Sequence, residues 1–257
     1  YGATKIPLQA FEEGIAHAAT NGRVLVSIFF DGGIDSLSVL APTGDPRYAT
    51  LRPTLALGAS EGTAFGEDAT MRWHPAAAPL AQLHSEGKVS AFPAIGYDDP
   101  NQSHFTSRHF YEIGELQVGA RTGWLGRYID RTGDENNPLQ GLSLDGSLSP
   151  MLATANMPVA AVSDPTEFDM WTRGTGSYVD PQMFGSFHNL GNMGNPATDP
   201  AHMKHVRRAT AQTAELREQL ESFGTYTSPV TYPNTSFARK LSGLAALIAA
   251  GLPLSCV

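Results

Sequence analysis

The sequence predicts an α/β fold, in which a mostly parallel, doubly wound sheet carries helices on both faces. Two apolar runs, residues 23–30 and 89–95, have the near-continuous hydrophobicity of strands buried on both faces. Each run follows a segment with helical spacing of apolar residues and precedes a polar turn. The order of helix, strand, turn and helix occurs twice before residue 115, which is typical of right-handed βαβ units.

Length and composition fit a single globular α/β domain over residues 1–257. The 257 residues are 41% hydrophobic and 16% charged, which favours a folded chain over a disordered one. The formal net charge of −8 argues against a nucleic-acid partner, which needs a basic face. No run approaches the roughly 18 apolar residues of a membrane span. The single cysteine, Cys256, excludes an intrachain disulfide and a cysteine-based zinc site.

The remaining elements follow from spacing and turn residues. Apolar residues at three- and four-residue intervals predict helices at residues 7–21, 75–86, 106–113, 122–129, 200–223 and 237–250. Short apolar stretches predict further strands at residues 141–144 and 157–162. Residues 172–200 are rich in Gly, Asn, Pro and Met without a period, which indicates an irregular excursion. This excursion is either a lid over a pocket or an ordinary surface loop.

Residues 252–257 are typical of the beginning of a strand. In the predicted architecture, a strand after a helix continues for several residues and ends in a functional loop. We therefore expect the sheet to be incomplete at its C-terminal end and to be completed by further residues or by a second chain. The alternative is a short edge strand that ends at Val257.

The turn after residues 23–30 carries two carboxylates, Asp31 and Asp35, around Gly32 and Gly33. The glycines permit positive φ and the close approach of a ligand or a neighbouring backbone. Carboxylates at the carboxyl end of a strand are good ligands for a divalent metal such as zinc, calcium or magnesium. The alternative is a tight turn whose acids cap the next helix.

The turn after residues 89–95 places Ser103 and His104 where a strand passes into a helix. Ligands of open parallel sheets bind at the carboxyl ends of the strands, and the free N–H groups of a helix start attract an anion. Ser103 and His104 are therefore the candidate catalytic residues, and Asn101 is a candidate for substrate binding. Arg127 is either an anion clamp for the substrate or a plain surface charge.

One cluster of positive charge lies at Lys204, Arg207 and Arg208, next to His202 and His205. Two histidines three residues apart on a helix can hold a metal, but no third ligand is evident near them. We interpret this face as solvated.

An ordered set of motifs links the chain to a known family. The motifs are residues 24–42 with Phe-Phe-Asp-Gly-Gly-Ile-Asp-Ser-Leu, residues 44–55, residues 74–80, residues 96–105 with Ser-His-Phe, Gly-Trp-Leu-Gly-Arg at 123–127, and Tyr-Pro at 232–233. Together they resemble a bacterial exported family, the domain-of-unknown-function family numbered 1501, which is related to sulfatases and alkaline phosphatases. The resemblance covers almost the whole chain from Val24 onward.

The resemblance implies an alkaline-phosphatase-like fold, export by the twin-arginine route to the periplasm or beyond, and metal-dependent hydrolysis of small phosphate or sulfate esters. By the same resemblance, Asp35 is a metal ligand and Asp31 a second candidate. Ser103 occupies the place of the nucleophile, activated by the metal, and His104 is its motif neighbour.

The chain departs from the family pattern at Ser36, where the family has glycine, and at Asp31, where a basic residue is common. The family segments that carry the remaining metal ligands would fall beyond Val257. We favour the hydrolase when those segments are present, and keep as the alternative a non-catalytic exported protein that acts as a binding or interaction subunit. A metal-free pair of Ser103 and His104 ranks last, because no Gly-x-Ser-x-Gly elbow surrounds Ser103 and adjacent side chains seldom converge.

Overall fold

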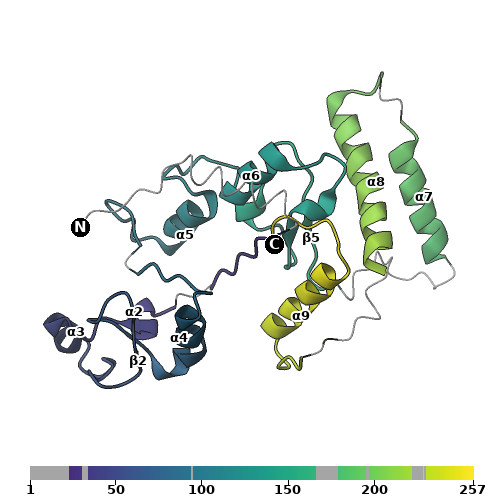
Figure 1. Ribbon diagram of the computed structural model, residues 1–257. Helices are drawn as coiled ribbons and strands as arrows, with labels where there is room; N and C mark the ends of the chain where they lie inside the picture. Colours follow the sequence, from purple (N-terminus) through teal and green to yellow (C-terminus); the bar gives the residue numbers. More distant parts are fainter. Residues whose placement is uncertain are drawn as a thin grey trace. The chain divides into compact units, whose positions relative to one another are not determined.

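The computed structural model describes residues 23–30, 34–93, 95–165, 179–194, 197–221, 228 and 230–257. The chain forms two compact units (Figure 1). The small unit is Ile28–Pro100, and the large unit joins the residues up to Ser27 to Asn101–Val257. The helix predicted at residues 7–21 and the carboxylate Asp31 lie outside the described residues.

The small unit is built from short elements around a three-stranded antiparallel sheet. In chain order they are α2 (Ser36–Val39), β1 (Leu40–Ala41), α3 (Pro46–Leu51), β2 (Thr63–Ala64), β3 (Arg72–Trp73), η1 (Pro75–Ala77) and α4 (Ala78–Ser85). The strand order is β1-β3-β2, and Trp73 of β3 stands opposite both Leu40 and Thr63.

The core of the small unit gathers around Trp73. The indole is buried with Leu40, Phe65 and Ala81. The rings of Phe65 and Trp73 meet edge to face with centroids 5.7 Å apart, which is a favoured aromatic geometry. His84 of α4 closes the cluster, its ring centroid 4.9 Å from that of Phe65. His84 therefore packs α4 against the sheet.

The large unit is mainly helical. Its elements are α5 (His104–Ile113), α6 (Trp124–Thr132), η2 (Pro138–Gln140), β4 (Leu142–Ser143), η3 (Pro150–Leu152), β5 (Ala160–Ala161), α7 (Asp180–Asn192), α8 (Ala201–Glu221) and α9 (Ser236–Ala249). Gly114 ends α5 in the left-handed conformation at φ 65°, which glycine adopts without strain. The Thr235 side chain caps α9 by accepting a hydrogen bond from the Ala238 N–H.

Four short segments of the large unit pair side by side, all in parallel. Leu25 and Gly141 each form a parallel bridge with Cys256, and β4 pairs with β5 in parallel. The Cys256 N–H donates to the Gln140 carbonyl at 2.8 Å, and the Val257 N–H donates to the Leu25 carbonyl at 2.9 Å. Of residues 252–257, for which the beginning of a strand was predicted, only Cys256 forms β-bridges with other described residues, and none of the six lies in a strand.

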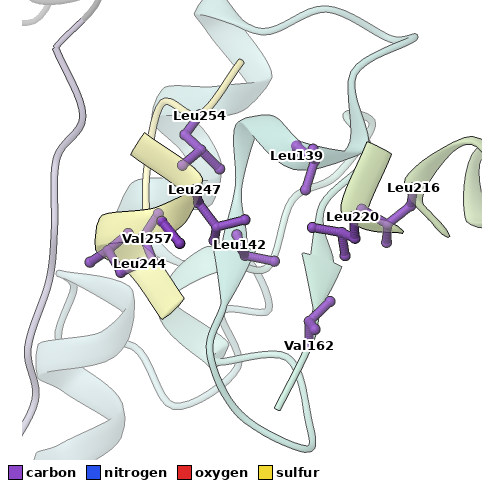
Figure 2. Packing of buried hydrophobic residues seen from close by; sticks show 10 residues of the cluster. Leu139, Leu142, Val162, Leu216, Leu220, Leu244, Leu247, Leu254 and Val257 are labelled. Atoms are coloured by element: carbon purple, nitrogen blue, oxygen red, sulfur yellow. The ribbon is translucent and has the colours of Figure 1, made fainter. Parts of the chain in front are cut away.

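The largest core cluster packs on these segments from two sides. Figure 2 shows Leu244 and Leu247 of α9 and Leu216 and Leu220 of α8 converging on Leu139 and Leu142. Val162, Leu254 and Val257 complete the labelled set. Burial of each such side chain contributes about 1.5–3 kcal/mol. Contacts with α8 and α9 therefore support a sheet whose strands have only two residues each.

Helices α7 and α8 lie side by side, α7 beginning at Asp180 (Figure 1). A Cβ built on Gly191 would come within 2.7 Å of the Ala211 backbone nitrogen, so the close approach requires glycine there. Arg207 holds the connection by an ion pair with Asp199, at 2.9 Å between Nε and Oδ2. The range 172–200, for which the sequence indicated an irregular excursion, therefore contains a regular helix.

The predicted doubly wound parallel sheet is wrong. Residues 23–30 contribute only the bridge at Leu25, and residues 89–93 and 95 are not in a strand. Phe92 and Ile95 are 68% and 66% exposed, whereas a central parallel strand is buried on both faces. The apolar runs have no neighbouring strands to pair with. The sheet of the small unit is antiparallel and consists of β1, β2 and β3, and neither apolar run pairs with it.

The helix predictions are mostly confirmed. Residues 75–86 contain η1 and α4, residues 106–113 lie in α5, and the last two predicted helices match α8 and α9 within a few residues. Among the described residues, no helix combines the length and the apolar character needed to cross a membrane.

Candidate functional site

The turn at Ser103 is shaped by its own polar side chains. Ser103 is the N-cap of α5, and its Oγ accepts a long hydrogen bond of 3.4 Å from the Thr106 N–H. The Asn101 side chain accepts from the Ser103 N–H at 2.7 Å, and the Asn101 carbonyl accepts from the Ser107 hydroxyl at 2.7 Å. Asn101, predicted to bind substrate, therefore holds the turn together.

His104 is the first residue of α5 and is exposed, like Ser103. Among the described residues, no hydrogen bond joins the imidazole of His104 to the hydroxyl of Ser103. A serine nucleophile and its base need a hydrogen bond of about 2.6–3.2 Å. The two candidate catalytic side chains are thus neighbours in sequence without forming a nucleophile–base pair.

Arg127 links the end of α5 to the start of α6. Its guanidinium donates to the Thr122 carbonyl at 2.9 Å and to the Ile113 carbonyl at 2.8 Å. Glu115 lies 3.3 Å from the same group. Because these partners occupy the guanidinium, Arg127 braces the loop between the two helices and is poorly placed to clamp a substrate anion.

Asp35 lies in the small unit, at the start of α2. Its carboxylate accepts two hydrogen bonds from the Arg52 guanidinium, one of them 2.8 Å long, and one from the Ser38 hydroxyl at 2.7 Å. The hydrogen bonds from Arg52, reinforced by Ser38, hold the pKa of Asp35 well below its ordinary value. The carboxylate is ionised near neutral pH, but a metal would have to displace Arg52.

The divalent metal implied by the family resemblance has no ligand set among the described residues. No group of three or more His, Cys, Asp or Glu side chains gathers there in a way that could hold a metal ion. Asp35 is paired with Arg52, and Asp31 lies outside the described residues. Within the described chain, the donor set does not fit zinc, calcium or magnesium.

A cleft of about 490 Å³ opens in the large unit, between α8 and the segment that leads into β5. The helix wall presents His205, Arg208 and Gln212, spaced three and four residues apart on one face. The opposite wall presents Pro158, Val159 and Ala160. The cleft therefore has a polar wall and an apolar wall.

Glu135 anchors the polar wall from outside the cleft. Arg208 Nη1 lies 3.2 Å from Glu135 Oε2, and Gln212 Nε2 donates to the Glu135 carbonyl at 2.7 Å. Arg208 Nη2 lies 3.5 Å from His205 Nδ1. Gln212 is only 9% exposed although it is polar. These contacts fix the orientation of side chains that would otherwise move freely on a helix surface.

The opposite wall is fixed by two buried or half-buried polar residues. The Asp130 carboxylate accepts backbone hydrogen bonds from Ala155, Asn156 and Met157 at 2.7–3.0 Å. Gln140, which is 1% exposed, donates its amide to the Pro158 carbonyl at 3.0 Å. Both walls are thus held by hydrogen bonds and ion pairs within the chain.

Sequence reasoning missed this cleft, although His202 and His205, whose face was interpreted as solvated, are both exposed. The usable signal was the three- and four-residue spacing of His205, Ala209, Gln212 and Leu216, which runs beside the core stripe of α8. The partner residues around Glu135 and Val159 lie far away in the sequence, so spacing alone could not reveal a second wall.

Comparison with known proteins adds no relative. No family model, no curated protein and no solved structure matches this chain. The resemblance to family 1501 therefore remains a hypothesis drawn from the ordered motifs.

Proposed function

We propose that this chain is a non-catalytic binding protein that accommodates a small molecule in the cleft between α8 and β5. The observation that carries the proposal is the cleft itself. Its volume of about 490 Å³ lies within the range of small-molecule sites, roughly 300–1,000 Å³. Such sites combine apolar walls with a few fixed polar groups.

The composition of the cleft supports this function. Val159 and Leu216 provide apolar surface, and Arg208 and Gln212 provide polar groups whose positions are set by Glu135. Polar side chains that are already oriented lose little entropy when a ligand binds. The arrangement favours a preformed site over a chance hollow between elements.

The residues predicted for catalysis, substrate binding and metal binding support a non-catalytic role. Ser103 caps α5, Arg127 braces a loop, and Asp35 is neutralised by Arg52. Each of these polar groups satisfies a structural requirement of its own unit. We propose further that the protein acts after export, as the family resemblance implies.

The test is to fill the cleft. Ala209 is exposed on α8 and lines the cleft, so Ala209→Phe should block it without disturbing the core. Fragments from a small-molecule library should bind the wild-type chain in ligand-observed NMR and lose binding to Ala209→Phe. Ala201→Phe, at the exposed start of α8, is the matched control and should retain binding. Equal fragment binding by all three proteins would contradict the proposal.

A second candidate function is hydrolysis of phosphate or sulfate esters at Ser103. It is favoured by the exposed hydroxyl of Ser103 at the start of a ten-residue helix, where the helix dipole stabilises negative charge. A divalent metal also belongs to this hypothesis, although the described residues assemble no ligand set.

Turnover of nitrophenyl phosphate and nitrophenyl sulfate, with zinc, magnesium or calcium added, tests this second function. Ser103→Asp is the sharpest variant, because aspartate keeps the N-cap while removing the hydroxyl. A hydrolase would lose turnover in Ser103→Asp and keep its fold. Turnover that persists in this variant, or that is absent from the wild-type chain with every metal, would contradict hydrolysis at Ser103. The binding function would then be the remaining proposal.

A further inference from the structure

We infer that the ligand of the α8–β5 cleft is a small organic carboxylate, its anionic group facing Arg208 and His205 and its apolar body facing Val159. This inference rests on the proposed binding function and specifies its ligand class. It follows from the charge of the walls, from the geometry of the cationic group and from the acceptors left open beside it.

The charge of the lining selects an anion. Arg208 and His205 are the ionisable side chains among the residues that line the cleft, and no carboxylate lines it. Glu135 meets Arg208 from outside, in a pair whose acid is 65% exposed. Water screens an exposed pair, so a ligand anion can share the Arg208 guanidinium with Glu135. In a chain of net charge −8, a cleft lined by an arginine and by no carboxylate is a local exception.

The donor groups suit one planar anion. A guanidinium carries five N–H donors in a fixed fork that matches a carboxylate. Arg208 uses Nη1 for Glu135 and directs Nη2 at His205 Nδ1. In either tautomer, the imidazole of His205 carries a ring N–H, which provides a further donor beside the guanidinium. Apart from these two contacts, three of the five guanidinium N–H groups remain, and with one imidazole N–H they are sufficient for a monocarboxylate.

The same site is poorly suited to phosphate or sulfate. Sites for these anions usually combine several Arg or Lys side chains, or use free backbone N–H groups at a helix start or in a nest. The cleft residues of α8 run from His205 to Leu216, inside a helix of 21 residues that begins at Ala201. Their backbone N–H groups are therefore committed to the hydrogen bonds of the helix. A dianion would find a single arginine and no backbone cradle.

The open acceptors indicate that the body of the ligand carries a donor. Gln212 uses its Nε2 for Glu135, and no described residue donates to its Oε1. Ala160 and Val162 direct their N–H groups at β4, so the backbone groups of Ala161 point to the opposite edge of the strand. A carboxylate with a nearby amide or hydroxyl group can satisfy both the strand edge and Gln212.

The experiment compares acids with their amides. The probes are N-acetylphenylalanine, N-acetylleucine and phenylacetate, each paired with its primary amide, with inorganic phosphate as a separate probe. Dissociation constants come from NMR titration of the whole chain. At least one acid should bind about tenfold or more tightly than its amide, because a charge-assisted bond is lost in the amide. Phosphate should bind more weakly than that acid.

Variants then assign the effect to the cleft. Arg208→Gln should bring the acid to the affinity of its amide, whereas Lys204→Gln, one turn earlier on an exposed part of α8, should leave the acid unchanged. Amides that bind as tightly as acids, or phosphate that binds best, would overturn the carboxylate inference while leaving the cleft as a binding site. If no probe binds but library fragments bind and are blocked in Ala209→Phe, the inference fails alone. If those fragments also fail, the proposed function falls with it.

Discussion

The Ser103 turn and the α8–β5 cleft are both rich in polar side chains. They differ in how far apart in the sequence the hydrogen-bonding partners of these side chains lie. At the turn, Asn101, Ser103, Thr106 and Ser107 bond to one another across at most six residues. At the cleft, Arg208 and Gln212 reach Glu135 across 73 and 77 residues. The turn uses its polar groups to make local structure, whereas the cleft wall uses distant partners to hold polar groups toward open space.

This difference indicates which polar side chains of the chain can still bind a ligand. A polar side chain consumed by its own turn has little capacity left for a ligand. One fixed by a distant partner can still present donors or acceptors, as Gln212 does with its Oε1. The contrast makes quantitative predictions, because the two regions should respond differently when a supporting residue is removed.

The largest effect is expected for Leu216, which belongs to the core cluster and also lines the cleft. Leu216 is 6% exposed, so Leu216→Ala leaves a cavity and should lower the free energy of unfolding by about 2–4 kcal/mol. Urea denaturation followed by circular dichroism measures it. Val206→Ala, at a 58% exposed position of the same helix, should change the stability by less than about 0.5 kcal/mol. Similar losses in both variants would mean that α8 is not anchored as described.

The sequence predicted the features that depend on neighbouring residues better than those that depend on residues far apart in the chain. Local signals located α4, α5, α8 and α9, because helix periodicity depends on residues three or four apart. The apolar runs around Phe29 and Phe92 misled the fold prediction, because a run indicates burial only if other strands pair beside it. Pairing partners are non-local and cannot be seen in the run itself.

The candidate site was predicted with the same limitation. The residue types near Ser103 and near Asp35 suggested chemistry. The sequence could not show that the Asp35 carboxylate is paired with Arg52, or that the Arg127 guanidinium donates to the Ile113 carbonyl. The cleft was missed because Glu135 and Arg208 are distant in the sequence. In this chain, the local sequence indicates which chemical groups are present, but it does not show whether other residues already bond to them.

An intermediate effect is expected for Asp130, which supports the apolar wall of the cleft from α6. Asp130→Asn keeps the shape but removes the charge and replaces one accepting oxygen with an NH2 group, so at least one of the three bonds from backbone N–H groups is lost. Stability near pH 7 should therefore fall by about 1–2 kcal/mol. Thermal unfolding measures the change. Asp99→Asn, at an exposed aspartate of the small unit, controls for the loss of one negative charge and should have little effect.

The pH dependence gives Asp130 a second signature. Burial by itself would raise the pKa of Asp130, but bonds from Ala155, Met157 and Asn156 outweigh it and lower the pKa. A lowered folded pKa means that the stabilisation is fully present above the unfolded value of about 3.9 and is lost as pH falls through the folded pKa. The wild type should therefore lose stability more steeply than Asp130→Asn below about pH 4. Parallel acid profiles would refute the assigned role.

The smallest effect is expected at the Ser103 turn, and it should remain local. Loss of an N-cap typically costs about 0.5–2 kcal/mol, and the long bond of 3.4 Å from Thr106 places Ser103→Ala near the lower end of that range. Ser103→Asp should restore most of the loss, since a carboxylate both caps the helix and favours its positive end. Hydrogen exchange should show the change in the first turn of α5, with the amide protection of α8 unaltered. Loss of protection in α8 as well would break the contrast, because it would couple the turn to the distant contacts that form the cleft.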